Sequence, residues 1–167
     1  MKDELLALRA RIEAEMQNIE RTVQRAQEAW EGANRFPNQQ DFYLDSVALN
    51  LHSFYNGLER IFEVIARQLD PVFPASERWH RDLLKQMTQE VSEARPAVLS
   101  NETAALLDDF LAFRHLIRNL YAFNLDAERL KQLFDQLPNA FSQARKDLES
   151  FCKLLETAVN QDNTGID

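Results

Sequence analysis

Apolar residues recur at helical spacing along most of the chain and divide it into five amphipathic segments. The first segment predicts a helix over residues 2–34, with a pattern typical of antiparallel packing in a bundle. Apolar residues stand at every seventh position of its stripe: Leu5, Ile12, Ile19, Ala26 and Ala33. A free coiled coil is the competing interpretation of this repeat. The later segments also need packing partners, and this favours the bundle.

The second and third helices are separated by a proline-containing loop. The second is predicted over residues 39–69 and ends at Asp70-Pro71, because proline lacks the amide donor that continues a helix. The third is predicted over residues 77–91, with Ser76 as its N-cap.

The last two helices carry the rest of the apolar pattern. The fourth is predicted over residues 102–123, capped by Ser100 or Asn101. The fifth is predicted over residues 127–159, and Pro138 should kink or break it because one backbone hydrogen bond is lost there.

The composition supports the same architecture. Only three glycines and five prolines occur among 167 residues, too few for a turn-rich β-sandwich or for the glycine-rich phosphate loops of nucleotide-binding folds. The sequence therefore predicts an all-α, antiparallel up-and-down bundle of about five helices. A single domain is expected over residues 1–160, with a frayed polar tail over residues 161–167.

Charge and cysteine content limit the functions that are open to the chain. Lys and Arg number 19 and Asp and Glu number 27, so the net charge is −8. Such an acidic surface disfavours broad, non-specific nucleic-acid binding but leaves room for a local basic site. The single Cys152 fits a reducing cytoplasm, where we expect the protein, and no apolar run approaches the length that spans a membrane.

The histidines show no metal-ligand spacing, and neither a metal nor another cofactor is predicted. His80, beside Trp79, is interpreted as a surface residue. Cys152 lies near the apolar stripe of the last helix and is expected to be packed rather than nucleophilic.

The candidate chemistry lies in the fourth predicted helix. At about 100° per residue, Arg114, Arg118 and Tyr121 fall on one flank of that helix. Leu107 and Leu111 share this flank and indicate a second apolar surface, which predicts a homodimer through the fourth helix.

Two interpretations of the arginines remain open. Arg114 and Arg118 either extend past the core and pair with acids, such as Glu59 with Arg118, or hold a phosphate between two guanidinium groups. The interpretations are compatible if one arginine is structural and the other is exposed. His115 is the nearby group that titrates close to neutral pH, and it is expected to face solvent or a partner.

The segments SFYNGLERIFEVIARQLD and FRHLIRNLYAFNLDAERL resemble the HepT-like proteins of the HEPN superfamily. The resemblance implies a helical bundle that dimerises and, in many members, cleaves RNA without a metal. The usual signature is an Arg followed by Asn or His, and then by a His four to six residues further on. Arg118-Asn119 matches its first part. The downstream His is absent, and His115 lies upstream instead, in an F-R-H-x-x-R-N-x-Y arrangement.

The resemblance implies a ribonuclease of a toxin–antitoxin type system, or a relative that has lost the activity. Arg114, His115 and Arg118 are then the candidate catalytic residues, and Asn119, Tyr121 and Glu59 the supporting ones. The implied partner is a nucleotidyltransferase antitoxin, for which a tyrosine of the motif can be the target. The alternative is a non-catalytic helical adaptor that binds a protein or a nucleotide.

Overall fold

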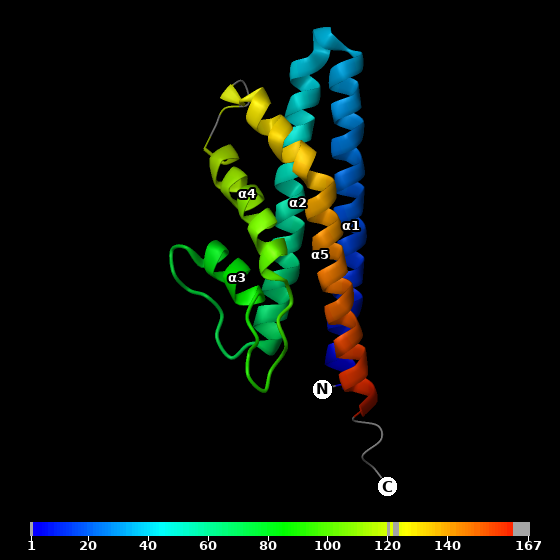
Figure 1. Cartoon of the computed structure of the whole chain (residues 1–167), viewed down its shortest axis with the longest axis vertical. Coiled ribbons are helices and arrows are strands. Elements are labelled where there is room, and N and C mark those ends of the chain that lie inside the picture. Colours follow the sequence, from blue (N-terminus) through cyan, green and yellow to red (C-terminus); the bar gives the residue numbers. More distant parts are fainter. Residues whose placement is uncertain (1, 120, 122–123, 162–167) are drawn as a thin grey trace.

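The computed structural model describes residues 2–119, 121 and 124–161 and contains only helices and loops within that part of the chain. Figure 1 shows the arrangement of the elements. They follow in the order α1 (Lys2–Arg35), the short 3₁₀ helix η1 (Pro37–Gln39), α2 (Gln40–Leu69), α3 (Trp79–Met87), α4 (Asn101–Ile117) and α5 (Ala127–Gln161). The predicted all-α class is confirmed.

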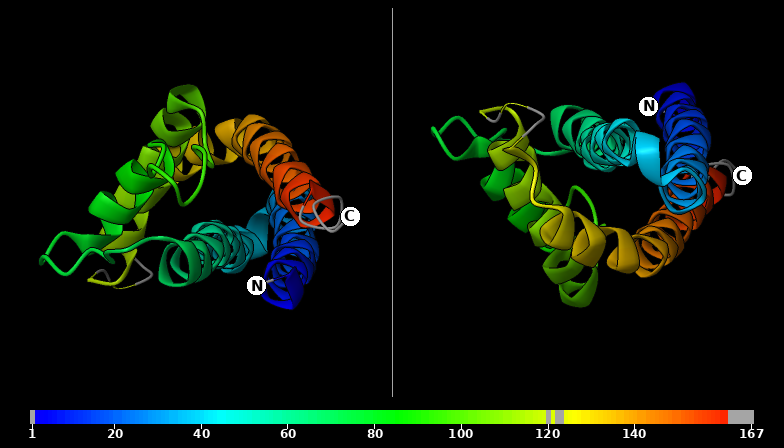
Figure 2. Two further views of the ribbon diagram at one scale, coloured as in Figure 1. Left: turned by 90° about the horizontal axis from the view of Figure 1, so that it is seen from below. Right: turned by 90° about the horizontal axis from the view of Figure 1, so that it is seen from above.

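Four long helices alternate in direction, and the short α3 lies against the outer side of the bundle (Figure 1). Viewed from its ends, the bundle has α1 on one side and α3 and α4 on the other, with α2 and α5 between them (Figure 2). Since α2 contacts all the other helices, a side chain on α2 can meet side chains from α3 and α4 at one point.

The helix boundaries differ from the predicted ones in instructive places. Ser100 caps α4 as predicted, accepting a hydrogen bond from the Thr103 amide. Ser76 does not cap α3, which begins three residues later and ends at Met87. Ser76 Oγ instead accepts from the Arg78 amide and donates to Asp82, so it shapes the preceding loop.

Pro138 does not break α5, contrary to one of the two predicted outcomes. The helix is continuous from Ala127 to Gln161. Its first part is inclined to the remainder in Figure 1, so the chain bends while the helical hydrogen bonds continue on either side. The predicted frayed tail, residues 161–167, lies outside the described residues except for Gln161, which ends α5.

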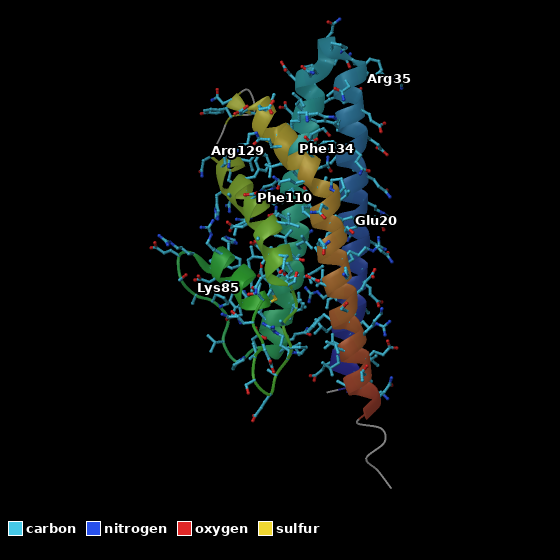
Figure 3. All side chains as sticks on the ribbon, viewed as in Figure 1. Glu20, Arg35, Lys85, Phe110, Arg129 and Phe134 are labelled. Atoms are coloured by element: carbon cyan, nitrogen blue, oxygen red, sulfur yellow. The ribbon has the colours of Figure 1, made fainter. Side chains whose placement is uncertain are left out.

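The core is rich in aromatic rings that join α2, α4 and α5. Phe54 packs edge-on against Phe110 and Phe141, with ring centroids 5.1 and 6.5 Å apart. Phe134 stacks on Trp30 of α1 at 4.7 Å. Figure 3 labels Phe110 and Phe134 on their helices. Cys152 is buried in this core, as predicted, and no described helix is long and apolar enough to cross a membrane.

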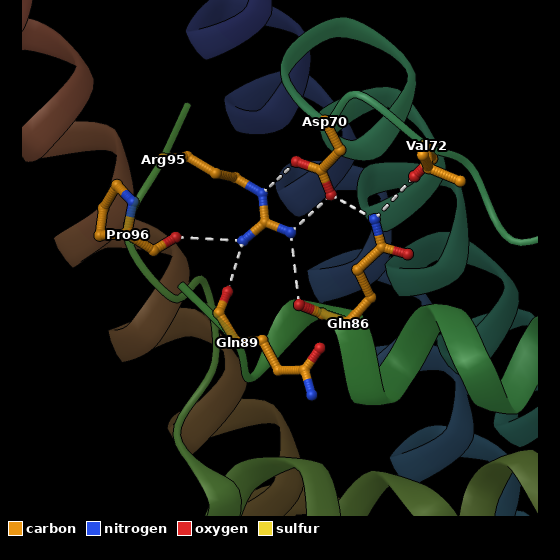
Figure 4. Close-up of polar contacts among 6 residues, drawn as sticks. All are labelled: Asp70, Val72, Gln86, Gln89, Arg95 and Pro96. Atoms are coloured by element: carbon orange, nitrogen blue, oxygen red, sulfur yellow. Dashed lines mark hydrogen bonds and ion pairs between the residues drawn. The ribbon is translucent and has the colours of Figure 1, made fainter. Parts of the chain in front are cut away.

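A buried ion pair fixes α3 to the end of α2. Arg95, in the loop before α4, binds Asp70 through Nε–Oδ1 at 2.6 Å and Nη2–Oδ2 at 2.7 Å, and both side chains are 1% exposed. Arg95 also donates to the main-chain oxygens of Gln89, Pro96 and Gln86, while the Gln86 amide donates to Asp70 (Figure 4). This network sets the position of α3 relative to α2.

Candidate functional site

The candidate site lies where the middle of α2, the start of α3 and the end of α4 meet (Figure 1). Arg114, in the last turn of α4, is its centre and is 9% exposed. Its Nε donates to Asn56 Oδ1 at 2.9 Å, and its Nη1 faces His80 Nε2 at 3.4 Å. Nη2 lies 3.6 Å from Glu59 Oε1. Each of the three guanidinium nitrogens therefore faces a side chain from one of two other helices, α2 or α3.

Arg114 sets the hydrogen positions of its neighbours, because a guanidinium group can only donate. Asn56 must turn its oxygen toward Arg114, so its Nδ2 faces His52 Nδ1 at 3.1 Å. His52 Nδ1 then accepts, and the neutral ring carries its proton on Nε2. On the other side His80 Nε2 accepts from Arg114, and its Nδ1 proton is donated to Glu59 Oε2 at 2.8 Å.

The interpretation of His80 as a surface residue is wrong. Its side chain is 13% exposed, and the Glu59 carboxylate that it binds is 6% exposed. Its ring lies against Trp79, with centroids 3.6 Å apart, and its edge faces His115 at 5.7 Å. All three histidines of the chain thus gather around Arg114.

The electrostatics of the site favour neutral imidazoles at two positions. Burial lowers the pKa of His52 below 6.5, and the charges of Arg114 and Arg118 lower it further. Burial and the Arg114 charge also lower the pKa of His115, which is exposed on α4. Both imidazole rings are therefore neutral at neutral pH and able to accept a proton, although two permanently charged arginines lie beside them.

Arg118 differs from Arg114 in its exposure and in its contacts. It is exposed at the C-cap of α4, where a positive charge is favourable, and its side chain makes no hydrogen bond or ion pair with the described residues. Asn119 is also exposed, and its side-chain amide donates to the His115 carbonyl at 3.1 Å, which caps the helix end. Arg114 is buried and held by its neighbours, whereas Arg118 is exposed, so the two arginines differ in the way that one of the sequence interpretations allowed.

The predicted single flank of Arg114, Arg118 and Tyr121 is wrong, because α4 ends at Ile117 instead of continuing to residue 123. Tyr121 follows the helix and is 73% exposed. Residues 120, 122 and 123, which the predicted helix included, lie outside the described residues. At the helix end, the Asn119 side chain donates to the His115 carbonyl and the Asn119 amide donates to the Leu116 carbonyl.

Two further expectations about this region need correction. Glu59 pairs with Arg114 and His80, and not with Arg118. Leu107 and Leu111 are both fully buried within the bundle, so they form no second surface for another chain. The sequence-based reason for dimerisation through α4 is therefore lost.

Among the residues of the candidate site, His80 and Asn56 were not predicted from the sequence. The missed signal for His80 is its spacing, because it precedes the buried Leu83, Leu84 and Met87 by three, four and seven residues. That spacing places it on the buried face of α3. In the described part of the chain, no three His, Cys, Asp or Glu side chains are grouped to hold a metal ion.

The comparisons with known proteins bear on the same region. A family model described as HepT-like protein matches residues 46–155, which is well over half of the chain and contains α3, α4 and most of α2. Comparisons with curated proteins and with solved structures gave no match. The predicted resemblance is confirmed at this level: the chain belongs to the HepT-like family of the HEPN superfamily.

Proposed function

We propose that the protein binds single-stranded RNA at Arg118 and Arg114 and cleaves it without a metal ion, as a toxin-type HepT-like ribonuclease. The observation that carries this proposal is the gathering of two arginines and all three histidines at one point of an otherwise acidic protein. The family membership supports the same class of activity.

The chemistry requires three groups, of which one copy of the site can supply two. Cleavage by the RNA 2′-hydroxyl needs a base for that hydroxyl, an acid for the leaving oxygen and positive charge for the phosphorane. Arg118, exposed and free to move, binds the scissile phosphate, and the buried Arg114 adds a fixed positive charge behind it. His115 is exposed with a lowered pKa, and it accepts the 2′-hydroxyl proton as a neutral ring.

A homodimer supplies the remaining acid in this proposal, from the partner's copy of the same cluster. The apolar surface that supports dimerisation lies on α2 rather than on α4. Phe42 and Leu49 are 75% and 63% exposed and stand seven residues apart on one face of α2. His52 and Asn56 continue that face toward the site, so a second copy seated on it would bring two clusters together.

The proposed regulator is a nucleotidyltransferase antitoxin acting on Tyr121. This tyrosine lies just beyond Arg118-Asn119, and 73% of the residue is exposed, which would let a modifying enzyme approach it. Modification there would place a bulky charged group beside the phosphate-binding arginine. Mass spectrometry of the protein after incubation with ATP and a minimal nucleotidyltransferase should detect one added nucleotide. No added nucleotide should be detected on the Tyr121→Phe variant.

The test of the proposed function is an RNA-binding and cleavage assay in excess EDTA with the Arg118→Ala variant. Loss of a charged hydrogen bond to phosphate should weaken binding about ten- to hundredfold and abolish cleavage, with helical content unchanged. The slope of log affinity against log salt should become shallower by about 0.7 per lost phosphate contact. Arg21→Ala is the matched control, since it removes one exposed arginine from α1.

Two outcomes would contradict this proposal. Cleavage that survives both Arg118→Ala and His115→Ala would remove the cluster from the reaction. A wild-type protein that neither binds nor cleaves RNA would favour the alternative, a non-catalytic adaptor that uses the same surface for a protein or nucleotide.

A further inference from the structure

We propose that His80 is a positioning residue of the RNA site: it links the buried Glu59 carboxylate to Arg114 and holds the guanidinium group in one orientation. This inference rests on the proposed function of Arg114 as an RNA-binding cation. His80 lies on α3, outside the F-R-H-x-x-R-N-x-Y segment that begins in the last turn of α4.

The geometry of the link is that of a chain of two hydrogen bonds. Glu59 Oε2 accepts from His80 Nδ1 at 2.8 Å, and His80 Nε2 accepts from Arg114 Nη1 at 3.4 Å. Because Arg114 cannot accept, the ring is held as the tautomer protonated on Nδ1. The Glu59 carboxylate and the Arg114 guanidinium group therefore both favour the His80 proton on Nδ1.

The His80 ring has little freedom to leave this position. One face lies against Trp79, whose centroid is 3.6 Å away, and Trp79 in turn contacts Phe73 at 5.8 Å. The other end of α3 is held to α2 by the buried Asp70–Arg95 pair through Gln86. Both ends of α3 are thus anchored, and the ring stays beside the guanidinium group.

This arrangement fixes the direction of the Arg114 charge. Asn56 and His80 each accept a hydrogen bond from the guanidinium group, and the Glu59 carboxylate lies 3.6 Å from Nη2 as an ion pair. The guanidinium group is therefore held in one orientation before RNA arrives. An arginine ordered in advance does not lose its side-chain freedom on binding, and this gain corresponds to about two- to tenfold in affinity.

A purely structural role is the competing explanation, since the buried Glu59 charge also needs a partner. Two substitutions separate the roles because each retains half of the link. His80→Asn retains a donor at the position of Nδ1 and loses the acceptor for Arg114. His80→Gln retains an acceptor at the position of Nε2, and His80→Phe fills the volume with no polar atom.

The experiment measures the affinity of these variants for a fluorescent single-stranded RNA, with Lys85→Ala as an exposed control on α3. His80→Asn and His80→Phe should bind about three- to tenfold more weakly, whereas His80→Gln and Lys85→Ala should stay within about twofold of wild type. Circular dichroism should show equal helical content. Wild-type affinity in His80→Asn would overturn the positioning role.

A spectroscopic readout separates this inference from the proposed function. At about pH 8, ¹⁵N–¹H correlation spectra should show His80 protonated on Nδ1 and a slowly exchanging Arg114 Nε–H signal. That signal should broaden or vanish in His80→Asn and persist in His80→Gln. If the wild type binds no RNA, the proposed function fails, and these signals still decide whether His80 orders Arg114. An Arg114 signal that is unchanged in His80→Asn would contradict the inference whatever the RNA result.

Discussion

Replacing Arg95 with methionine should destabilise the fold strongly, because the Asp70 carboxylate would stay buried without its cation. Arg95 makes five hydrogen bonds, two to Asp70 and three to main-chain oxygens around the end of α3 (Figure 4). Both side chains are 1% exposed, so water cannot replace the lost partner without opening the loop. After the substitution, Asp70 would keep only the Gln86 amide.

Removing one member of such a buried pair costs about 3–5 kcal/mol. For a chain of this length, each kcal/mol lowers the melting temperature by about 2–4 °C, so a fall of about 6–20 °C is expected. Arg145→Met is the matched control. Arg145 pairs with Glu20 and Glu149 on the surface, its side chain is 45% exposed, and its loss should cost at most about 1 kcal/mol.

Urea unfolding followed by circular dichroism measures both variants. The double variant Asp70→Leu, Arg95→Met should recover part of the loss, since removing both charges leaves no uncompensated one. Recovery should be incomplete, because the main-chain oxygens still lack their donor. A free energy of unfolding of Arg95→Met within about 1 kcal/mol of wild type would refute this reasoning.

Three further predictions concern packing and titration. Gly57→Ala should destabilise the protein by about 1–3 kcal/mol in urea unfolding, because the new Cβ would lie 2.6 Å from Ile19 Cγ1. This loss should outweigh the better helix propensity of alanine. A more stable variant would show that the Ile19 side chain moves to make room. The lowered pKa values of His52 and His115 mean that the folded protein binds protons more weakly than the unfolded chain, so the free energy of unfolding should decrease as the pH falls below 6.5. Replacing both histidines with glutamine should flatten that dependence, and an unchanged slope would count against these shifts. Burial raises the pKa of Cys152 to about 11, so a thiol reagent at neutral pH should label it slowly in the folded protein and rapidly in denaturant.

The fold was predictable because apolar spacing records which face of each helix is buried. The stripes of α1, α2 and α5 coincide with the observed core positions, including Ile12, Ile19 and Leu148. The end of α4 was not predictable in this way. Its apolar pattern continues past Ile117, but the helix ends there and the Asn119 side chain donates to the His115 carbonyl. A capping contact of this kind competes with helical periodicity and leaves no trace in it.

The site was predictable only in part, because its contacts join helices that are distant in sequence. An ion pair between Glu59 and an arginine of α4 was expected, but with Arg118, and the structure forms it with Arg114. The choice between Arg114 and Arg118 as the partner of Glu59 depended on the relative heights of α2 and α4, which periodicity does not give. His80 was missed because the short α3 has only three buried residues to define its face.

The most direct test of the central claim, that RNA binds at the cluster around Arg114, is an NMR titration of the histidine rings. The chain has three histidines, and all of them belong to the cluster, so each ring signal reports on the site. Adding a short single-stranded RNA to the wild-type protein should shift the His52 and His115 signals along one saturable curve. The same addition to Arg118→Ala should shift them far less. RNA binding detected by fluorescence while all three ring signals stay in place would contradict the account.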